Sequence, residues 1–197
     1  MKKTKVVYTY TVYHFVPILS NTRVTKRQNF EFKRIIMSDI KNSNCNSKCC
    51  PENNKEEHPA VSNFREYLRI RSVHPNVNYD GCVKFLEKQA ASLRLPIKVY
   101  SFAAGKPVVI ITWTGLEPKK ESILPNSHMD VVPAFPDQCT HDPFGAHKDE
   151  QGNIYARGSQ DMKCVGIQYL ETIRRFIADG KRCKRTLHVS FVPDEEI

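Results

Sequence analysis

The sequence lacks any long apolar run, and this absence limits the classes of protein to which it can belong. No stretch approaches the roughly eighteen consecutive apolar residues of a membrane-spanning helix. The basic start at Met1 resembles a secretion signal only faintly, because polar residues interrupt the apolar stretch and no small-residue cleavage site follows it. We therefore expect no membrane partner and no secretion.

The sequence also lacks the paired cysteines of a zinc finger or a disulfide framework. Its seven cysteines are an odd number, and the four in the body, Cys82, Cys139, Cys164 and Cys183, are scattered. Cys45, Cys49 and Cys50 form a cluster, but no second pair stands at finger spacing, so we interpret them as free thiols in a tail. This usage is typical of reduced thiols, and we expect a cytoplasmic location.

A large positive excess is missing from most of the chain, although the net charge is +9. Residues 1–58 hold 11 Lys and Arg against 5 Asp and Glu, a net of +6, whereas residues 59–197 hold 19 against 16, a net of +3. A basic tail is more often solvated than it is a binding arm, so we expect no nucleic-acid partner.

The chain divides into a tail and a body. Residues 38–58 consist mostly of polar and charged residues that cannot bury a core, and residues 1–37 show no clean apolar period. We interpret residues 1–56 as an unassigned or disordered basic tail, and residues 57–197 as the folded body. The body is long enough to bury a sizeable core.

Apolar periodicity predicts an α/β fold for the body, a mixed sheet flanked by helices. Helices are predicted from Pro59 to a point before His74, from about Tyr79 to Leu93, and over residues 162–178, with Gly180 as the C-cap. Strands are predicted over residues 97–102, 108–113, 122–127, 153–156 and 186–192. The β-branched run at 108–111 is typical of a strand covered on both faces.

The third helix is predicted to bury one apolar stripe. Its members recur at helical spacing: Met162, Val165, Tyr169, Ile173, Phe176 and Ile177.

The chemistry lies in three acidic segments, each beside predicted strand. In the first, His128 and Asp130 are two residues apart, so on an extended chain both point to the same side. A neutral imidazole is a good zinc ligand, and a nearby carboxylate can accept its second N–H and orient it. Alone, this pattern is more often a surface histidine beside an acid.

The other two segments supply further carboxylates. Asp161 stands just before the helix at 162–178, where it is either an N-terminal cap or a ligand able to bridge two cations. Glu195 and Glu196 follow the last strand and diverge on an extended chain, so one can bind a metal while the other reaches a water. A solvated loop is the alternative. However, Asp194, Glu195 and Glu196 are three adjacent acids, and they repel one another unless cations or water reduce that repulsion.

The order of these segments resembles the zinc aminoacylase/carboxypeptidase family of metallohydrolases. The resemblance covers about residues 57–197 and rests on Ser127-His128-Met129-Asp130-Val131-Val132-Pro133, Tyr155-Ala156-Arg157-Gly158-Ser159-Gln160-Asp161-Met162-Lys163 and Phe191-Val192-Pro193-Asp194-Glu195-Glu196. It implies the N-terminal half of a zinc-exopeptidase-like catalytic domain and the hydrolysis of N-acyl-L-amino acids to a carboxylate and a free L-amino acid.

The resemblance also implies a role for each residue. His128 would bind one zinc, Asp161 would bridge two, and Glu196 would bind the second; the complete site holds two Zn²⁺. Glu195 would be the general base and Asp130 would orient His128. The Asp161–Met162 peptide bond would be cis, as is typical of the family.

The chain departs from the family at three positions. Met129 replaces a small residue, Cys139 replaces a tryptophan, and Pro125 stands where an aliphatic strand residue is usual. Because proline removes a ladder donor, the strand at 122–127 is expected to be broken locally or to lie at an edge.

The family also has parts that these 197 residues do not supply. They are one more acidic zinc ligand, a histidine near the C-terminus, and a lid domain that mediates dimerisation. We expect the site to be truncated after Ile197, the chain alone to be poorly active, and the full-length protein to be a homodimer. Two alternatives stay open: a dipeptidase or carboxypeptidase of the same superfamily, and a non-catalytic truncated product.

Overall fold

The computed structural model describes residues 57–197, and everything below concerns that part of the chain. The expected tail at 1–56 and the cluster at Cys45, Cys49 and Cys50 lie outside the described residues.

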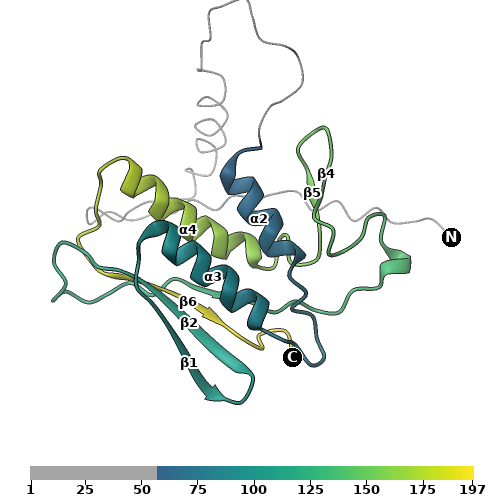
Figure 1. Ribbon diagram of the computed structural model, residues 1–197, viewed down its shortest axis with the longest axis horizontal. Coiled ribbons are helices and arrows are strands. Elements are labelled where there is room, and N and C mark those ends of the chain that lie inside the picture. The colour runs from purple at the N-terminus through teal and green to yellow at the C-terminus, as the bar shows by residue number, and fades with distance from the viewer. Residues whose placement is uncertain (1–56) are drawn as a thin grey trace, which may run out of the picture. The chain divides into compact units, whose positions relative to one another are not determined.

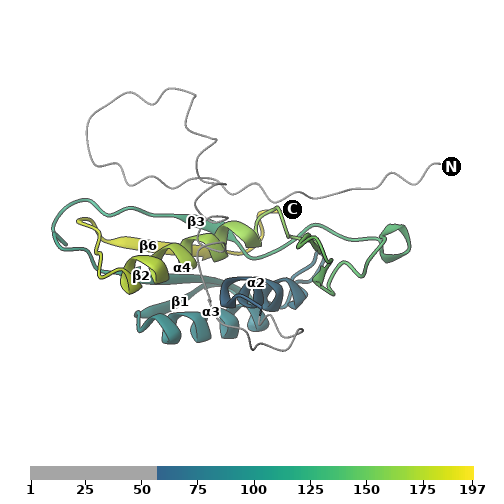
Figure 2. The same cartoon turned by 90° about the horizontal axis from the view of Figure 1, so that it is seen from above.

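A four-stranded mixed sheet forms the centre of the fold (Figure 1). Its strands, in spatial order, are β1 (Ile97–Ala103), β2 (Lys106–Trp113), β6 (Leu187–Val192) and β3 (Asn126–His128). β1 pairs with β2 and β2 pairs with β6 in antiparallel fashion, whereas β3 runs parallel to β6. Figure 2 shows the four strands following one another across the molecule in this order. A separate hairpin joins β4 (His147–Lys148) and β5 (Ile154–Tyr155).

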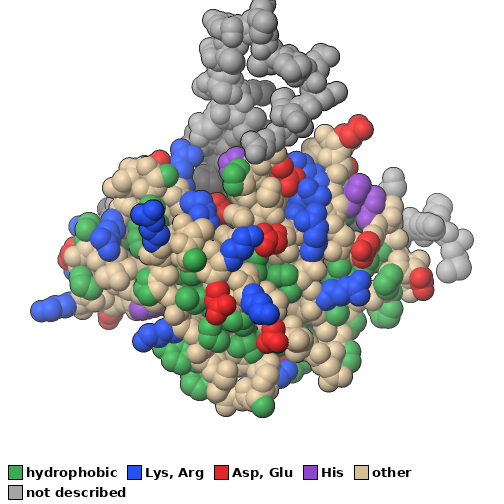
Figure 3. Space-filling view, in the orientation of Figure 1, with side chains coloured by type: hydrophobic (Ala, Val, Ile, Leu, Met, Phe, Trp, Pro, Cys, Tyr) green, Lys and Arg blue, Asp and Glu red, His purple; other side chains and the backbone are tan. Residues whose placement is uncertain are grey.

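Three α-helices and one 3-10 turn complete the described fold: α2 (Pro59–Arg69), α3 (Asp80–Leu93), η1 (Pro136–Gln138) and α4 (Lys163–Ala178). α4 packs against β3 and against α2, while α3 packs against β1 and β2. None of the described helices is both long and apolar enough to cross a membrane. Acidic and basic side chains are interspersed over the described residues of the face in Figure 3.

The core lies between the helices and one face of the sheet. Val109, Ile111 and Phe191 are fully buried there. Burial alternates along β2, so the expectation of a strand covered on both faces is wrong for the described residues. The reason is that the described helices cover one face only, and side chains such as Tyr100 on the other face are 37% exposed.

The first predicted helix ends earlier than expected. It stops at Arg69 because Ile70 is already extended, and Val73 then forms a parallel bridge with Val131. The predicted strand at 122–127 is reduced to Asn126–His128, at the edge of the sheet. This outcome follows the expectation from Pro125, which offers only its carbonyl, to the N–H of Ser190 at 2.9 Å.

The buried face of α4 is rotated relative to the predicted stripe. The buried residues are Lys163, Cys164, Gly166, Ile167, Leu170 and Ile173. Of the predicted stripe only Ile173 is fully buried, and Ile177 is 42% exposed. A glycine and a lysine carry no apolar signal, so periodicity alone could not place this face. The C-cap of α4 is Asp179, not the predicted Gly180, and Gly180 follows it in the left-handed conformation with φ of 65°.

Candidate metal centre

Parallel pairing of β3 and β6 brings two of the three acidic segments together. His128 is in register with Val192, so both strands reach the same edge of the sheet. The residues that follow β6 therefore turn past the end of β3. This turn includes Asp194, which adopts a positive φ of 58°, and places Glu196 beside His128.

A close helix–sheet contact brings in the third segment. At Gly166 of α4, an added Cβ would lie 2.8 Å from a ring carbon of Phe191 and 3.1 Å from the Oγ of Ser127. Only glycine lets α4 approach β6 and β3 this closely. Because Asp161 precedes α4 by two residues, this contact fixes the distance between Asp161 and the strand ends.

The three predicted ligands form one cluster. Each of His128, Asp161 and Glu196 offers a ligand atom, and these atoms all lie within 4.8 Å of one another. His128 Nε2 is 3.2 Å from Asp161 Oδ1, with the imidazole 4% exposed and the Asp161 side chain 76% exposed. The cluster is therefore anchored on a buried imidazole and open to solvent on the carboxylate side.

The proton arrangement of His128 fits a cation. Its Nδ1 lies 3.0 Å from the backbone carbonyl of Asp130, which can only accept, so Nδ1 carries the proton. With the proton on Nδ1, a neutral ring offers its Nε2 lone pair on the side of the Asp161 carboxylate, 3.2 Å away, where both atoms can bind one cation. Two zinc ligands about 2.1 Å from one ion at the tetrahedral angle stand about 3.4 Å apart, close to this separation.

The carboxylates of Asp161 and Glu196 also favour a bound cation. Burial raises the pKa of Glu196, and the negative charge of Asp161 raises it further, because both effects disfavour a second carboxylate charge at this point. A bound cation would relieve that repulsion. The donor set of one imidazole and two carboxylates is one that zinc accepts.

Asp130 lies behind the cluster and is fully buried. Burial alone would raise its pKa, but hydrogen bonds from the backbone N–H of Glu196 and from His74 bring that pKa below the ordinary value. Its carboxylate Oδ1 is 3.5 Å from His128 Nδ1, farther than its own backbone carbonyl. The closest contact that orients His128 thus comes from the Asp130 main chain, with the carboxylate next to it.

The remaining expectations have separate outcomes. Asp161 is not a cap, because Met162 is the N-cap of α4 and the Asp161 side chain faces His128. The Asp161–Met162 peptide bond is cis, as the family resemblance implied. Glu195 is exposed beside the cluster but is not one of its three members, and its role as a base stays a prediction.

Two residues that the sequence reasoning did not select contribute to the site. His74 donates to the buried Asp130 carboxylate at 2.8 Å, and Lys163 reaches back to the carbonyls of Tyr67 at 3.2 Å and Ile70 at 2.7 Å. Lys163 is 1% exposed and burial lowers its pKa to about 8. His74 has no periodic signal in the sequence, since only its pairing beside Val131 brings it to the site.

Known proteins share both the sequence and the fold of this region. The model of Peptidase family M20/M25/M40 matches residues 124–197. Aminoacylase-1 of Homo sapiens is 53% identical over 143 residues, which are 73% of this chain and 35% of that protein. The chain therefore spans about a third of the length of the aminoacylase-1 relatives that it matches.

Two solved structures share the fold. An M20 family metallo-carboxypeptidase, Sso-CP2 from Sulfolobus solfataricus, has a TM-score of 0.61 at 22% identity, covering 68% of this chain and 30% of that one. The dipeptidase Dug1p from Saccharomyces cerevisiae has a TM-score of 0.59 at 23% identity, covering 69% and 32%. The matched segment contains the whole cluster of His128, Asp161 and Glu196, so the part of the chain that carries the cluster is similar to Peptidase family M20/M25/M40, and aminoacylase-1 is among the relatives of the chain.

Proposed function

We propose that the protein of which these residues are part hydrolyses N-acyl-L-amino acids to a carboxylate and a free L-amino acid. The single observation that carries the proposal is the convergence of His128, Asp161 and Glu196 from three segments of a chain 53% identical to aminoacylase-1 over 143 residues. The name of that relative, aminoacylase-1, describes the proposed activity on N-acyl amino acids.

We further propose that the metal is zinc, with two ions in the complete site. When bound, zinc acts as a Lewis acid that lowers the pKa of a water molecule and polarises an acyl carbonyl. His128 would hold one ion through Nε2, Asp161 would bridge the pair, and Glu196 would hold the second. The described residues bring these three donors together, and a catalytic zinc takes three protein ligands, so a pair needs donors beyond them.

The chain's own residues then perform the proton transfers. Glu195 accepts a proton from the attacking water, the oxygen adds to the acyl carbon, and the C–N bond breaks as Glu195 returns the proton to the departing nitrogen. Asp130 keeps its carbonyl on His128 Nδ1, so in the neutral imidazole the proton stays on Nδ1 and the Nε2 lone pair is available to the metal. The products are one carboxylic acid and one free amine, the acid proton passes to the amine to give a carboxylate and an ammonium group, and the base is restored.

Metal binding by the purified 197-residue chain tests the ligand assignment. Calorimetric titration with Zn²⁺ should show binding that Glu196→Gln weakens by more than about 100-fold, beyond the loss expected for an outer partner. Glu150→Gln, a change at an exposed acid of the β4–β5 hairpin, is the matched control and should leave the affinity unchanged. Equal zinc affinity in all three proteins would remove the basis for the assignment.

A substrate panel tests the activity. We expect the chain alone to hydrolyse N-acetyl-L-methionine poorly, and a longer product of the same gene to hydrolyse it faster than it hydrolyses dipeptides. A preference for dipeptides would favour the dipeptidase or carboxypeptidase alternative. Absence of both zinc and activity in the longer product would favour the non-catalytic one.

We also propose a cytoplasmic location and a homodimer for the whole protein. The location is supported by Cys82, Cys139, Cys164 and Cys183, which are free thiols in the described part of the chain. The dimer rests on the family resemblance alone, and sedimentation of the longer gene product tests it.

A further inference from the structure

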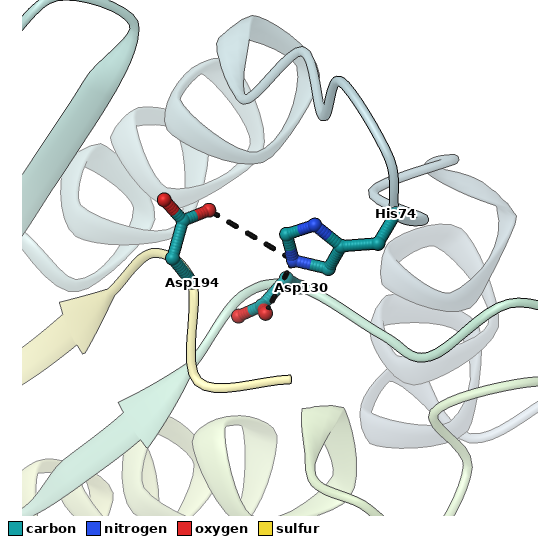
Figure 4. Close-up of side chains that lie close together, drawn as sticks. All are labelled: His74, Asp130 and Asp194. Atoms are coloured by element: carbon teal, nitrogen blue, oxygen red, sulfur yellow. Dashed lines mark hydrogen bonds and ion pairs between the residues drawn. The ribbon is translucent and has the colours of Figure 1, made fainter. Parts of the chain in front are cut away.

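A second histidine stands behind the metal cluster and holds the residue that orients His128. Figure 4 shows His74 between Asp130 and Asp194. Its Nε2 lies 2.8 Å from Asp130 Oδ2 and 3.8 Å from Asp194 Oδ1. The His74 side chain is 9% exposed and that of Asp130 is fully buried.

Main-chain pairing fixes His74 in this place. The N–H of Val131 donates to the carbonyl of Ser72 at 2.9 Å, and the N–H of His74 donates to the carbonyl of Val131 at 3.3 Å. The Ser72 hydroxyl also donates to the carbonyl of Met129 at 2.6 Å. The segment 72–74 thus pairs alongside residues 129–131, and this pairing places the His74 ring beside the Asp130 carboxylate.

The donors around Asp130 determine which way its carboxylate faces. A carboxylate only accepts hydrogen bonds, so His74 Nε2 carries the proton. The backbone N–H of Glu196 donates to the same Oδ2 at 2.9 Å. With both donors on Oδ2, the other oxygen, Oδ1, has no hydrogen bond of its own and lies 3.5 Å from His128 Nδ1. Losing the His74 donor would leave Oδ2 with the Glu196 N–H alone, so Asp130 would be held by one hydrogen bond fewer.

We propose that His74 is a positioning residue: by donating to Asp130 Oδ2 it holds in place Asp130, the residue whose backbone carbonyl sets the orientation and tautomer of His128. Its consequence for zinc rests on the proposed function, whereas its consequence for the His128 ring does not. The side chain acts through Asp130 and does not contact the metal cluster itself.

The alternative is that His74, Asp130 and Asp194 bind a metal of their own, since their ligand atoms lie within 4.8 Å of one another. Asp194 already has two partners that argue against it. The Tyr79 hydroxyl donates to Asp194 Oδ1 at 2.7 Å, and Lys106 forms an ion pair with Asp194 Oδ2. The Lys106 ion pair balances the charge of Asp194, and the N–H at His74 Nε2 donates to the Asp130 carboxylate. These groups therefore have partners without a cation.

Two substitutions separate the hydrogen bond from the shape of the ring. His74→Phe keeps a planar ring and removes the donor, whereas His74→Gln places an amide N–H near the position of Nε2. His188→Phe is the matched control, because His188 is half-buried and bonds Thr112 through Nδ1 at 2.9 Å on the open face of the sheet.

Ring-nitrogen NMR of the metal-free chain gives the readout that does not depend on zinc. At a pH where the rings are neutral, wild type, His74→Gln and His188→Phe should show His128 as the single Nδ1–H tautomer. His74→Phe should show a mixture. An unchanged His128 tautomer in a folded His74→Phe variant overturns the proposal, and so does a mixture in His74→Gln as large as that in His74→Phe.

Zinc titration of the same four proteins and of Asp194→Asn gives the second readout. Zinc affinity should fall by about tenfold in His74→Phe, within the 10–100-fold range for an outer partner, and stay within about threefold in the other variants. Loss of one bound metal per chain in His74→Phe and in Asp194→Asn would instead show a metal at this cluster and overturn the proposal. If wild type binds no zinc, the proposed function fails, while the NMR result still decides the role of His74.

Discussion

The close contact of α4 with the sheet at Gly166 allows the effect of a Gly166→Ala substitution to be predicted. The new Cβ would stand 2.8 Å from a Phe191 ring carbon, whereas ordinary contact begins at 3.4 Å, so α4 or β6 must shift by the difference of 0.6 Å. Overpacking of this kind costs about 1–3 kcal/mol. Replacing a helical glycine by alanine returns about 0.8–1 kcal/mol. We expect a net loss of about 1 kcal/mol.

Urea unfolding of the 197-residue chain measures that loss, and the melting temperature should fall by about 2–4 °C. Since the shift moves Asp161 relative to His128, zinc affinity should also fall, by about tenfold. Gly81→Ala is the control: it is also helical, but its Cβ meets only the Ile70 side chain, at 2.9 Å. That side chain is half-buried and can rotate, so stability should change by less than about 0.5 kcal/mol. A Gly166→Ala chain that is more stable than wild type and binds zinc equally well would refute the reasoning.

Three further predictions follow from single residues. In the metal-free chain, burial lowers the pKa of Lys163 from its ordinary value of 10.5 to about 8, so the unfolded chain binds more protons between these values. Stability should therefore rise with pH across that window, by up to about 3 kcal/mol, and urea unfolding at several pH values should show a smaller rise in Lys163→Met. Gly158→Ala should lower stability and zinc affinity together, because φ there is 80° and an added Cβ would lie 2.6 Å from Val131; unchanged values would contradict the described loop. In thiol labelling followed by peptide mapping, exposed Cys139 should react well before Cys82, where burial raises the pKa of the thiol, and the reverse order would contradict the described packing.

The sequence predicted the elements better than it predicted the faces they bury. Strands and helices with strong apolar runs, such as β2 and α3, lie close to their predicted positions. The prediction of the buried face of α4 was wrong because that face includes Gly166 and Lys163, which a count of apolar residues ignores. The open face of β2 was missed because a β-branched run does not show how many layers cover a strand.

The residues of the site could also be predicted only in part. The three acidic segments could be selected from their residue types and order, and the structure brings His128, Asp161 and Glu196 into one cluster. Their meeting depends on the parallel register of β3 and β6, which no local pattern encodes. His74 could not be found in advance, because its contact with Asp130 arises from a bridge between residues far apart in the chain.

The central claim is that three segments of this chain assemble one end of a metal site. The most direct test is X-ray diffraction from crystals of the chain grown with Zn²⁺, with data collected at the zinc absorption edge. We predict an anomalous peak in contact with His128 Nε2 and with carboxylate oxygens of Asp161 and Glu196. A well-ordered His128 with no peak beside it, or zinc bound only at other residues, would contradict the claim.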